Sequence, residues 1–271
     1  MKQLAILTTS IIDEQCVVAS QNSLHKFLIS KNPDVHFTQI VHVDNHKRSL
    51  GRYSGSLDSI INIYKNQCDA KNYTCNLIIG NPRNGIIKAA YNLFESFIET
   101  NIENCLIFED DTTLERDVNI SNLLNIFSDD SILHLSFAVE TTATSAYSTE
   151  MPFINEGKDN FYSEKEYIFF KRKYKEKPSF TWNGTFLNQN LIRLILKSYN
   201  KNITNESGYP EDQIAKILYK SNPELFIKTI FYNAPLHDEQ VKEGWNLKIS
   251  PSQHVIFDKI RYSGGRSRAL Y

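Results

Sequence analysis

Apolar and polar positions follow a regular rhythm along the first 110 residues of the chain. Short apolar runs closed by polar residues predict buried strands, and longer stretches with apolar side chains every three or four positions predict helices. Pro33 marks the end of the first helix, because a proline restricts the residue before it. The predicted strands are Gln3–Thr8, Val35–Val43, Cys75–Ile79 and Asn104–Phe108, and the predicted helices are Ile12–Ser30, Leu57–Asn66 and Gly85–Glu99. This alternation predicts parallel pairing with right-handed crossovers, and hence a doubly wound α/β sheet.

The rhythm changes after Asp111. A long polar stretch, Glu140 to Glu166, is expected to be a loop, and a loop of that length inside a compact domain is usually functional. The other elements predicted here are strands at Ile132–Phe137, Tyr167–Tyr174, Ser179–Leu187 and Leu225–Tyr232, and helices at Ser121–Phe127, Gln189–Tyr199 and Glu211–Tyr219. We expect the strands of this half to form a smaller antiparallel portion.

The length of 271 residues suits one large α/β domain. We expect one domain over 1–271, with 1–115 and 116–240 as its two halves and 241–271 as a tail or lid. The 30 Lys and Arg residues nearly balance the 31 Asp and Glu residues. This balance does not indicate a nucleic-acid backbone or an anionic membrane as the main partner.

No apolar stretch of the sequence approaches the roughly 20 residues that a membrane span needs, so we expect none. The four cysteines contain no CxxC pair, which favours a reducing, intracellular compartment. The expected location is therefore cytoplasmic, whether in an infected cell or at the inner surface of a membrane.

Three consecutive acids, Glu109, Asp110 and Asp111, follow the fourth predicted strand. Clustered carboxylates repel one another, and a bound cation relieves the repulsion. Their hard oxygen atoms suit Mg²⁺ or Mn²⁺ held together with substrate phosphates. A solvated acidic loop is the alternative interpretation, and the position after an apolar strand favours the metal.

Polar residues also follow the other predicted strands, where ligands of doubly wound sheets bind. Thr8 closes the first strand, Asp44 closes the second, and Arg83 with Asn84 precedes the third helix, on which Lys88 lies. Positive charge near a helix N-terminus favours an anion. An ordinary turn with a surface Arg and Lys explains that segment equally well.

The second half of the chain offers four further candidates, each with an ordinary structural explanation beside the functional one. Glu211 and Asp212 suit the positive end of a helix, and Asp212 also suits a general base that takes a proton from a hydroxyl. Trp182 is either a sugar-stacking ring or part of the core, and His237 is either structural or a metal ligand from the C-terminal half. Arg266 lies in a basic, glycine-containing tail that is either flexible or a lid over an anion.

Taken in chain order, these segments resemble the GT-A glycosyltransferases, which use nucleotide-diphospho-sugars, over roughly Lys2 to Leu236. The resemblance rests on the DxD-like segment 109–111, on Asp44 after the second strand, on Arg83 to Asn92, and on the acid pair 211–212, which is similar to that of inverting members. Glu109 replaces the first aspartate of the motif, and the first strand lacks the proline and asparagine of the largest branch. The exact family is therefore unassigned.

The resemblance implies a Rossmann-like GT-A fold and transfer of a sugar from a nucleoside diphosphate, with UDP as the first expectation, to a hydroxyl acceptor. It implies that Asp111 binds Mn²⁺ or Mg²⁺, that Glu109 or Asp110 faces the ribose or a metal-bound water, and that Asp212 is the base of an inverting reaction. Lys88, Arg83 and Arg266 would stabilise the charge on the leaving diphosphate.

Three alternatives stay open at this point. A retaining transferase would keep the metal site without needing Asp212 as base. The segment 109–113 also resembles the DxDxT loop of aspartate-nucleophile phosphatases, but here a glutamate stands at the nucleophile position and the loop follows the fourth strand. The third alternative is a non-catalytic module that binds carbohydrate or nucleotide. Its acids would only cap helices and interact with solvent. The acceptor, whether a glycan, a protein or a nucleic-acid base, is not defined by the sequence.

Overall fold

The computed structural model describes residues 2–45, 55–67, 72–80, 85–110, 114, 117–127, 134–136, 161–164, 167–171, 184–198, 214 and 229–233. These residues fall into two compact units, one within 1–123 and the other within 124–252. Each unit is described by itself below. In the described ranges, no helix is both long and apolar enough to cross a membrane.

The first unit contains a sheet in which β3, β2, β1 and β4 lie side by side in that order. Their pairings are all parallel. The strands are β1 (Lys2–Ser10), β2 (Val35–Asp44), β3 (Tyr73–Gly80) and β4 (Asn104–Ile107), and the helices between them are α1 (Glu14–Leu24), continued by the π-helical η1 (His25–Ile29), α2 (Leu57–Asn66) and α3 (Gly85–Ile98). The predicted alternation of strands and helices is therefore confirmed.

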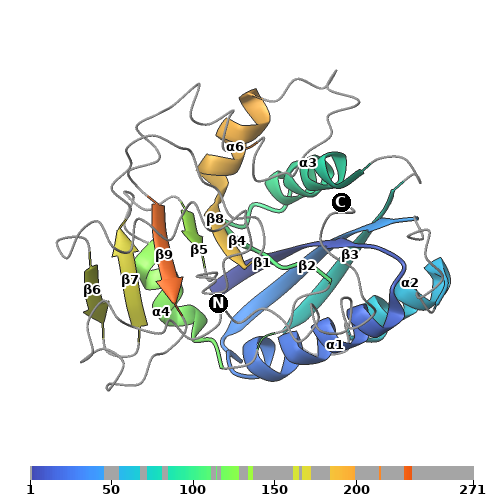
Figure 1. The fold of residues 1–271 in the computed structure, drawn as a ribbon, viewed down its shortest axis with the longest axis horizontal. Helices are drawn as coiled ribbons and strands as arrows, with labels where there is room; N and C mark the ends of the chain where they lie inside the picture. The colour runs from blue at the N-terminus through green and yellow to red at the C-terminus, as the bar shows by residue number, and fades with distance from the viewer. Residues whose placement is uncertain are drawn as a thin grey trace, which may run out of the picture. The chain divides into compact units, whose positions relative to one another are not determined.

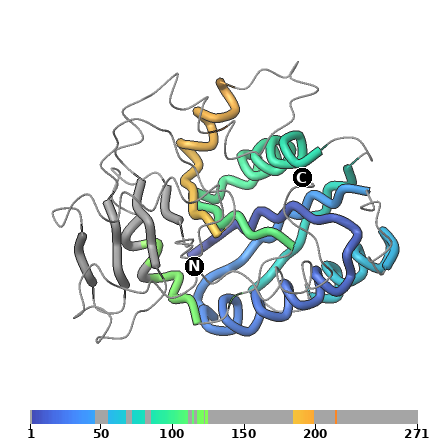
Figure 2. The backbone as a smooth tube through the Cα atoms, in the orientation of Figure 1, coloured from blue at the N-terminus to red at the C-terminus, as the bar shows by residue number. Residues whose placement is uncertain are grey.

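Helices cover both faces of this sheet (Figure 1). The chain steps from β1 to β2 to β3 in one direction, so right-handed crossovers place α1 and α2 on one face. It then returns past β2 and β1 to β4, which places α3 on the other face, where it contacts β1 and β2. Figure 2 shows how β1 leads through a short turn into α1. The unit is thus doubly wound, as predicted.

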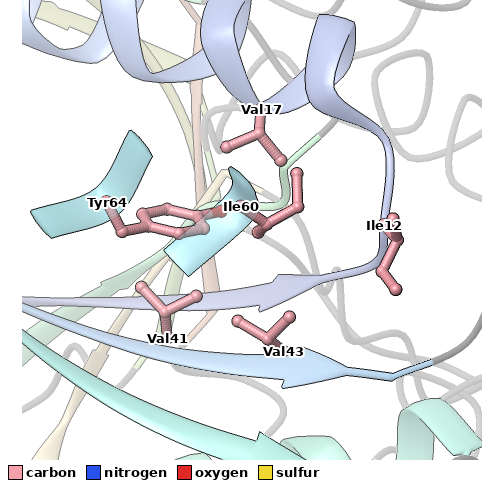
Figure 3. Packing of buried hydrophobic residues seen from close by; sticks show 6 residues of the cluster. All are labelled: Ile12, Val17, Val41, Val43, Ile60 and Tyr64. Carbon is pink, nitrogen blue, oxygen red and sulfur yellow. The ribbon is translucent and has the colours of Figure 1, made fainter. Parts of the chain in front are cut away.

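The core between β2 and the helices α1 and α2 is built from aliphatic side chains and one tyrosine (Figure 3). Its members are Ile12, Val17, Val41, Val43, Ile60 and Tyr64, each 3% exposed or less. Burying one such aliphatic side chain stabilises a fold by about 1.5 to 3 kcal/mol. Because side chains alternate along a strand, Val41 and Val43 direct His42 and Asp44 to the opposite face, which α3 covers.

Two boundaries differ from the sequence prediction for a physical reason. Parallel pairing extends from Lys2 beside Val35 to Ser10 beside Val43, so β1 continues two residues beyond the predicted end at Thr8. The helix N-cap is consequently Asp13, whose carboxylate accepts a hydrogen bond from the amide of Cys16 at 3.2 Å. In contrast, α2 matches its prediction because Ser56 forms a reciprocal capping box at its start.

The second unit contains five strands in the order β8, β5, β9, β7 and β6. The bounds are β5 (His134–Ser136), β6 (Phe161–Glu164), β7 (Tyr167–Lys171), β8 (Thr185–Asn188) and β9 (Thr229–Asn233), with helices α4 (Ile120–Phe127), at the point where the first unit ends, and α6 (Gln189–Ser198). Antiparallel pairs join β5 to β8, β7 to β9 and β6 to β7, whereas β5 and β9 are parallel. The antiparallel portion is confirmed, although β6 lies inside the stretch predicted to be a loop.

Candidate functional site

The carboxyl ends of the parallel strands meet along one edge of the first unit. Gly80 at the end of β3 lies beside Asp44 of β2, and Val43 lies beside Ser10 of β1. On the far side of β1, the amide of Phe108 donates to the carbonyl of Leu7 at 2.9 Å, and the amide of Asp110 donates to the carbonyl of Thr9 at 3.3 Å. Hydrogen bonding to β1 therefore continues beyond the end of β4 as far as Asp110.

The gap between β1 and β4 is the point at which the order of the strands reverses. From β1 the chain proceeds outward through β2 and β3, and only later returns to place β4 on the other side. Ligands of open α/β sheets bind outside the carboxyl ends of the strands at such a switch point. Glu109 and Asp110 come directly after β4 at this position.

Asp110 is held inside the protein at the switch point. Its side chain belongs to a residue that is 4% exposed, and its Oδ2 atom accepts hydrogen bonds from the amide of Ile11 at 2.8 Å and from the hydroxyl of Ser10 at 3.1 Å. The backbone of the neighbouring Glu109 is also fixed, since its carbonyl accepts a hydrogen bond from the hydroxyl of Ser20 at 3.2 Å. Asp110 is therefore attached to the end of β1, and Glu109 is attached to α1.

A tyrosine from α2 lies behind this attachment. Tyr64 is fully buried, and burial together with the negative charge of Asp110 raises the pKa of its hydroxyl well above the ordinary value, while the hydroxyl of Ser10 opposes the rise. The phenol thus stays protonated. Tyr64, Ser10 and Asp110 bring α2, β1 and the end of β4 into one polar cluster on the α1 and α2 face.

A second polar cluster lies on the opposite face at the end of β2. His42 is fully buried, with its Nε2 atom 3.0 Å from the Nδ2 atom of Asn92 on α3 and its Nδ1 atom 3.8 Å from Oδ1 of Asp44. Burial is the largest cause that lowers the pKa of His42, and a backbone hydrogen bond raises this pKa in part. The charge of Lys88, which lies one turn before Asn92 on α3, lowers it further. The ring of His42 is therefore neutral. It lies beneath Asp44, whose side chain is 15% exposed.

Gly80 lets the end of β3 approach this cluster closely. A Cβ atom at this position would lie 2.4 Å from Cε1 of His42 and 2.8 Å from Oδ1 of Asp44, distances that side chains do not adopt. The backbone of β3 thus forms one wall of the cluster. Asp44, His42, Gly80, Lys88 and Asn92 together make an edge that presents one carboxylate and one exposed ammonium group to solvent.

Thr8, which the sequence suggested as a ligand contact, faces the interior in this structure. It is fully buried, and its hydroxyl accepts a hydrogen bond from the side-chain amide of Gln39 at 2.8 Å. Gln39 in turn accepts a hydrogen bond from the hydroxyl of Tyr73. Ser10, two residues further along β1 on the same face, is the hydroxyl that reaches the carboxyl edge. The role of Thr8 in ligand binding stays a prediction.

Several predicted site residues lie outside the described residues. They are Arg83, Asn84, Asp111, Trp182, Glu211, Asp212, His237 and Arg266. Among the residues that the structure describes, no three His, Cys, Asp or Glu side chains converge as a metal site. Asp44, Lys88, Glu109 and Asp110 do lie at the same carboxyl edge of the first unit.

Sequence reasoning missed His42 and Gly80, and it gave no role of their own to Ser10, at the end of the first strand, or to Asn92, in the segment from Arg83 to Asn92. His42 could have been found from the sequence, because it precedes Asp44 by two positions in an alternating strand. The two side chains therefore lie on the same face of the sheet. Asn92 lies one helical turn after Lys88. The close approach at Gly80 depends on the pairing of β2 with β3, which the local sequence does not specify.

No family model matches the chain, and no curated protein matches its sequence. Solved structures do match. The mannosyltransferase PcManGT from Pyrobaculum calidifontis, in complex with GDP-Man and Mn²⁺, has a TM-score of 0.51 and 9% identity over 87% of this chain and 57% of that one. TarS of S. aureus has a TM-score of 0.49 and 12% identity over 90% of this chain and 38% of TarS. Residues 1–349 of TarS in complex with UDP have a TM-score of 0.47 and 12% identity over 90% of this chain and 63% of that TarS fragment.

The chain therefore spans less than two thirds of the length of each of these three proteins. At 9% identity, the similarity to PcManGT concerns the fold alone. The chain has the α/β fold of this mannosyltransferase, in agreement with the GT-A class expected from the sequence. A fold by itself does not define a reaction, so function has to be argued from the residues at the carboxyl edge.

Proposed function

We propose that the chain is a metal-dependent glycosyltransferase that moves a sugar from a nucleoside diphosphate, UDP being the first to test, to a hydroxyl of a glycan or another acceptor. The observation that carries the proposal is the carboxyl edge of the first unit. There, Asp44 ends β2, Lys88 extends from α3, and Glu109 follows β4 at the switch point. The similarity in fold to a mannosyltransferase bound to GDP-Man and Mn²⁺ supports the same class.

The charges along this edge suit the two parts of a nucleotide-sugar. Asp44 carries a carboxylate that can accept hydrogen bonds from a ribose or a base, and the neutral ring of His42 lies below it. Lys88 is exposed in the first turns of α3, where the helix dipole adds to its own positive charge. Together they offer a place for a nucleoside beside a place for phosphates. Arg83 and Asn84, just before α3, and Arg266 belong to the same proposed phosphate site.

The acids that follow β4 offer carboxylate oxygen atoms, which are the ligands that hard divalent cations prefer. Glu109 and Asp111, with His237 from the second half, are the residues that we propose to hold Mn²⁺ or Mg²⁺. The metal, when bound, would neutralise the charge that develops on the leaving diphosphate. Lys88 and the arginines would also stabilise that charge.

We propose that Asp212 is the general base and that Glu211 lies beside it. The acceptor hydroxyl gives its proton to Asp212 as its oxygen forms a bond to the anomeric carbon. The bond between that carbon and the diphosphate oxygen breaks, and its electron pair stays on the diphosphate. Attack from the face opposite the leaving group inverts the configuration. Trp182 is proposed to stack on a sugar ring near this carbon.

Titration calorimetry tests the donor half of the proposal. The purified chain is titrated with UDP, GDP, ADP and CDP and with their sugars, first with Mn²⁺ and then with EDTA, and the titrations are repeated on Asp111→Ala. We expect one nucleotide to bind only with the metal, and the variant to lose this binding. Asp117→Ala serves as a matched control, because Asp117 forms an exposed ion pair with Lys31 and belongs to no proposed site. Absence of binding across the whole panel would contradict the proposal.

A further inference from the structure

We propose that Asp110 is a positioning residue that joins β4 to the β1 to α1 connection, and that it is not a ligand of the metal or the donor. Glu109 is then the acid of this pair that faces the donor. The inference rests on the proposed function and deepens it, because it divides the acids of the segment between structure and binding. The sequence and the resemblance leave the roles of Glu109 and Asp110 interchangeable.

The hydrogen bonds of Asp110 support the structural role. Both the amide of Ile11 and the hydroxyl of Ser10 donate to the same oxygen, Oδ2, at 2.8 and 3.1 Å. The residue is 4% exposed. If the carboxylate turned outward to bind a cation, these two donors would lose their acceptor, and an unpaired buried donor is costly. The geometry therefore favours a carboxylate that stays inside.

The backbone of the segment determines which side each acid takes. The amides of Phe108 and Asp110 donate to the carbonyls of Leu7 and Thr9, which is the spacing of a parallel ladder. Side chains alternate along such a ladder. Asp110 bonds to Ser10 on the face covered by α1 and α2, so alternation assigns Glu109 to the face covered by α3.

The face assigned to Glu109 is the one that holds the rest of the proposed donor site. His42 contacts Asn92 of α3, and Asp44 shares the face of His42 because it lies two residues further along β2. The charge of Lys88 acts on His42 from the same helix. Glu109, Asp44 and Lys88 are thus assigned to the side of the sheet that α3 covers, and Asp110 is on the other side.

The position of Asp110 explains why a charged residue serves as this link. It lies where the chain crosses the switch point, and it holds the turn that precedes the N-cap of α1 against the end of β4. A carboxylate accepts two strong hydrogen bonds on one oxygen atom and so fixes both segments.

Three variants separate positioning from ligation. In Asp110→Asn, the amide oxygen replaces Oδ2 and can accept both hydrogen bonds, whereas the charge is lost. Asp110→Ala removes the link, and Ser10→Ala removes one of its two donors while leaving every acid in place. Glu109→Gln is the matched comparison, because it removes the charge of the neighbouring acid by the same chemical change.

The readouts are the Mn²⁺-dependent affinity for nucleotide, measured by calorimetry, and the proton NMR shift of the Ile11 amide. We expect Asp110→Asn to keep the affinity within about threefold, and Glu109→Gln to lose at least about tenfold. The Ile11 amide should shift upfield in Asp110→Asn and further in Asp110→Ala, and it should not move in Glu109→Gln. Ser10→Ala should weaken nucleotide binding in the same direction as Asp110→Ala, but less.

A loss of affinity in Asp110→Asn equal to that in Glu109→Gln, in a protein that still folds, would overturn the inference. If the wild-type chain binds no nucleotide with Mn²⁺, the proposed function fails and so does the donor role of Glu109. The link itself is then judged by the Ile11 amide and by thermal unfolding. An amide shift that Asp110→Ala leaves unchanged would show that the link does not exist.

Discussion

The Nε2 atom of His42 on β2 lies 3.0 Å from the Nδ2 atom of Asn92 on α3. Because an amide nitrogen only donates, the ring nitrogen must accept, and the proton of the neutral imidazole is then on Nδ1. Nδ1 lies 3.8 Å from Oδ1 of Asp44. The contact between β2 and α3 therefore sets both the tautomer of His42 and the direction in which the ring presents its N–H to Asp44.

The lowered pKa of His42 makes stability depend on pH. Below the ordinary value of 6.5, the unfolded chain takes up a proton at His42 that the folded protein resists. The free energy of unfolding should therefore fall as pH decreases from 6.5, and this penalty is absent above 6.5. We expect His42→Gln, which can still accept a hydrogen bond from Asn92, to show a shallower fall in urea unfolding between about pH 7.5 and about pH 5.

His25 provides the matched comparison for this measurement. Burial lowers its pKa as well, so it contributes to the pH dependence in the same direction. The double variant with His25→Gln and His42→Gln should have a flatter profile than either single variant. A profile for His42→Gln that coincides with the wild type would contradict the prediction.

Gly80→Ala is expected to destabilise the first unit. Its new methyl group would lie 2.4 Å from Cε1 of His42 in a packed site, and relieving such overpacking costs about 1 to 3 kcal/mol. Gly85→Ala is the control, since its Cβ would meet nothing within 4 Å and only the left-handed φ of +70° opposes it. That conformation costs about 1 to 2 kcal/mol.

The two glycines are distinguished by a double-mutant cycle, measured by urea unfolding. Removing the ring with His42→Ala should reduce the cost of Gly80→Ala and leave the cost of Gly85→Ala unchanged. Equal costs for Gly80→Ala in both backgrounds would mean that the ring of His42 is not the obstacle.

Asn32→Ala should reduce stability by about 2 to 3 kcal/mol, because it leaves buried groups unpaired. The side chain of Asn32 donates to the carbonyls of Leu28 at 2.6 Å and Val118 at 2.8 Å, and it accepts from the amide of Ile120 at 2.9 Å. Asn72→Ala is the control, with one bond to the carbonyl of Val35 at 3.1 Å and an expected loss of about 1 kcal/mol. Urea unfolding compares them, and equal losses would contradict this account.

Asp212→Asn should separate binding from chemistry in the proposed reaction. We expect kcat to fall by about 10² to 10⁴, while the affinity for the donor stays the same, since the base contacts the acceptor. The measurement combines calorimetry with single-turnover kinetics, and NMR of the product gives the configuration at the anomeric carbon. A retained configuration would exclude Asp212 as the base of an inverting step.

Much of the first unit could be read from the sequence because its elements are set by local signals. The apolar runs of β1 to β4, the capping serine before α2 and the proline after η1 each act within a few residues. Alternation of strands and helices then leaves few topologies. In the second half, β5, β7, β8 and β9 overlap predicted strands, whereas β6 lies inside the polar stretch that was predicted to be a loop. Antiparallel pairing with β7 decided β6.

The sequence by itself determined the doubly wound fold of the first unit, the acid that ends β2 and the acids that follow β4. Only the tertiary structure decided which face each of these residues takes. Asp110 turns inward because Ser10 and the amide of Ile11, about a hundred positions earlier in the chain, meet it across the switch point. Asp44 lies above His42 because α3 returns over the other face of the sheet. Register and crossover set these contacts, and no local sequence pattern encodes partners so far apart in the chain.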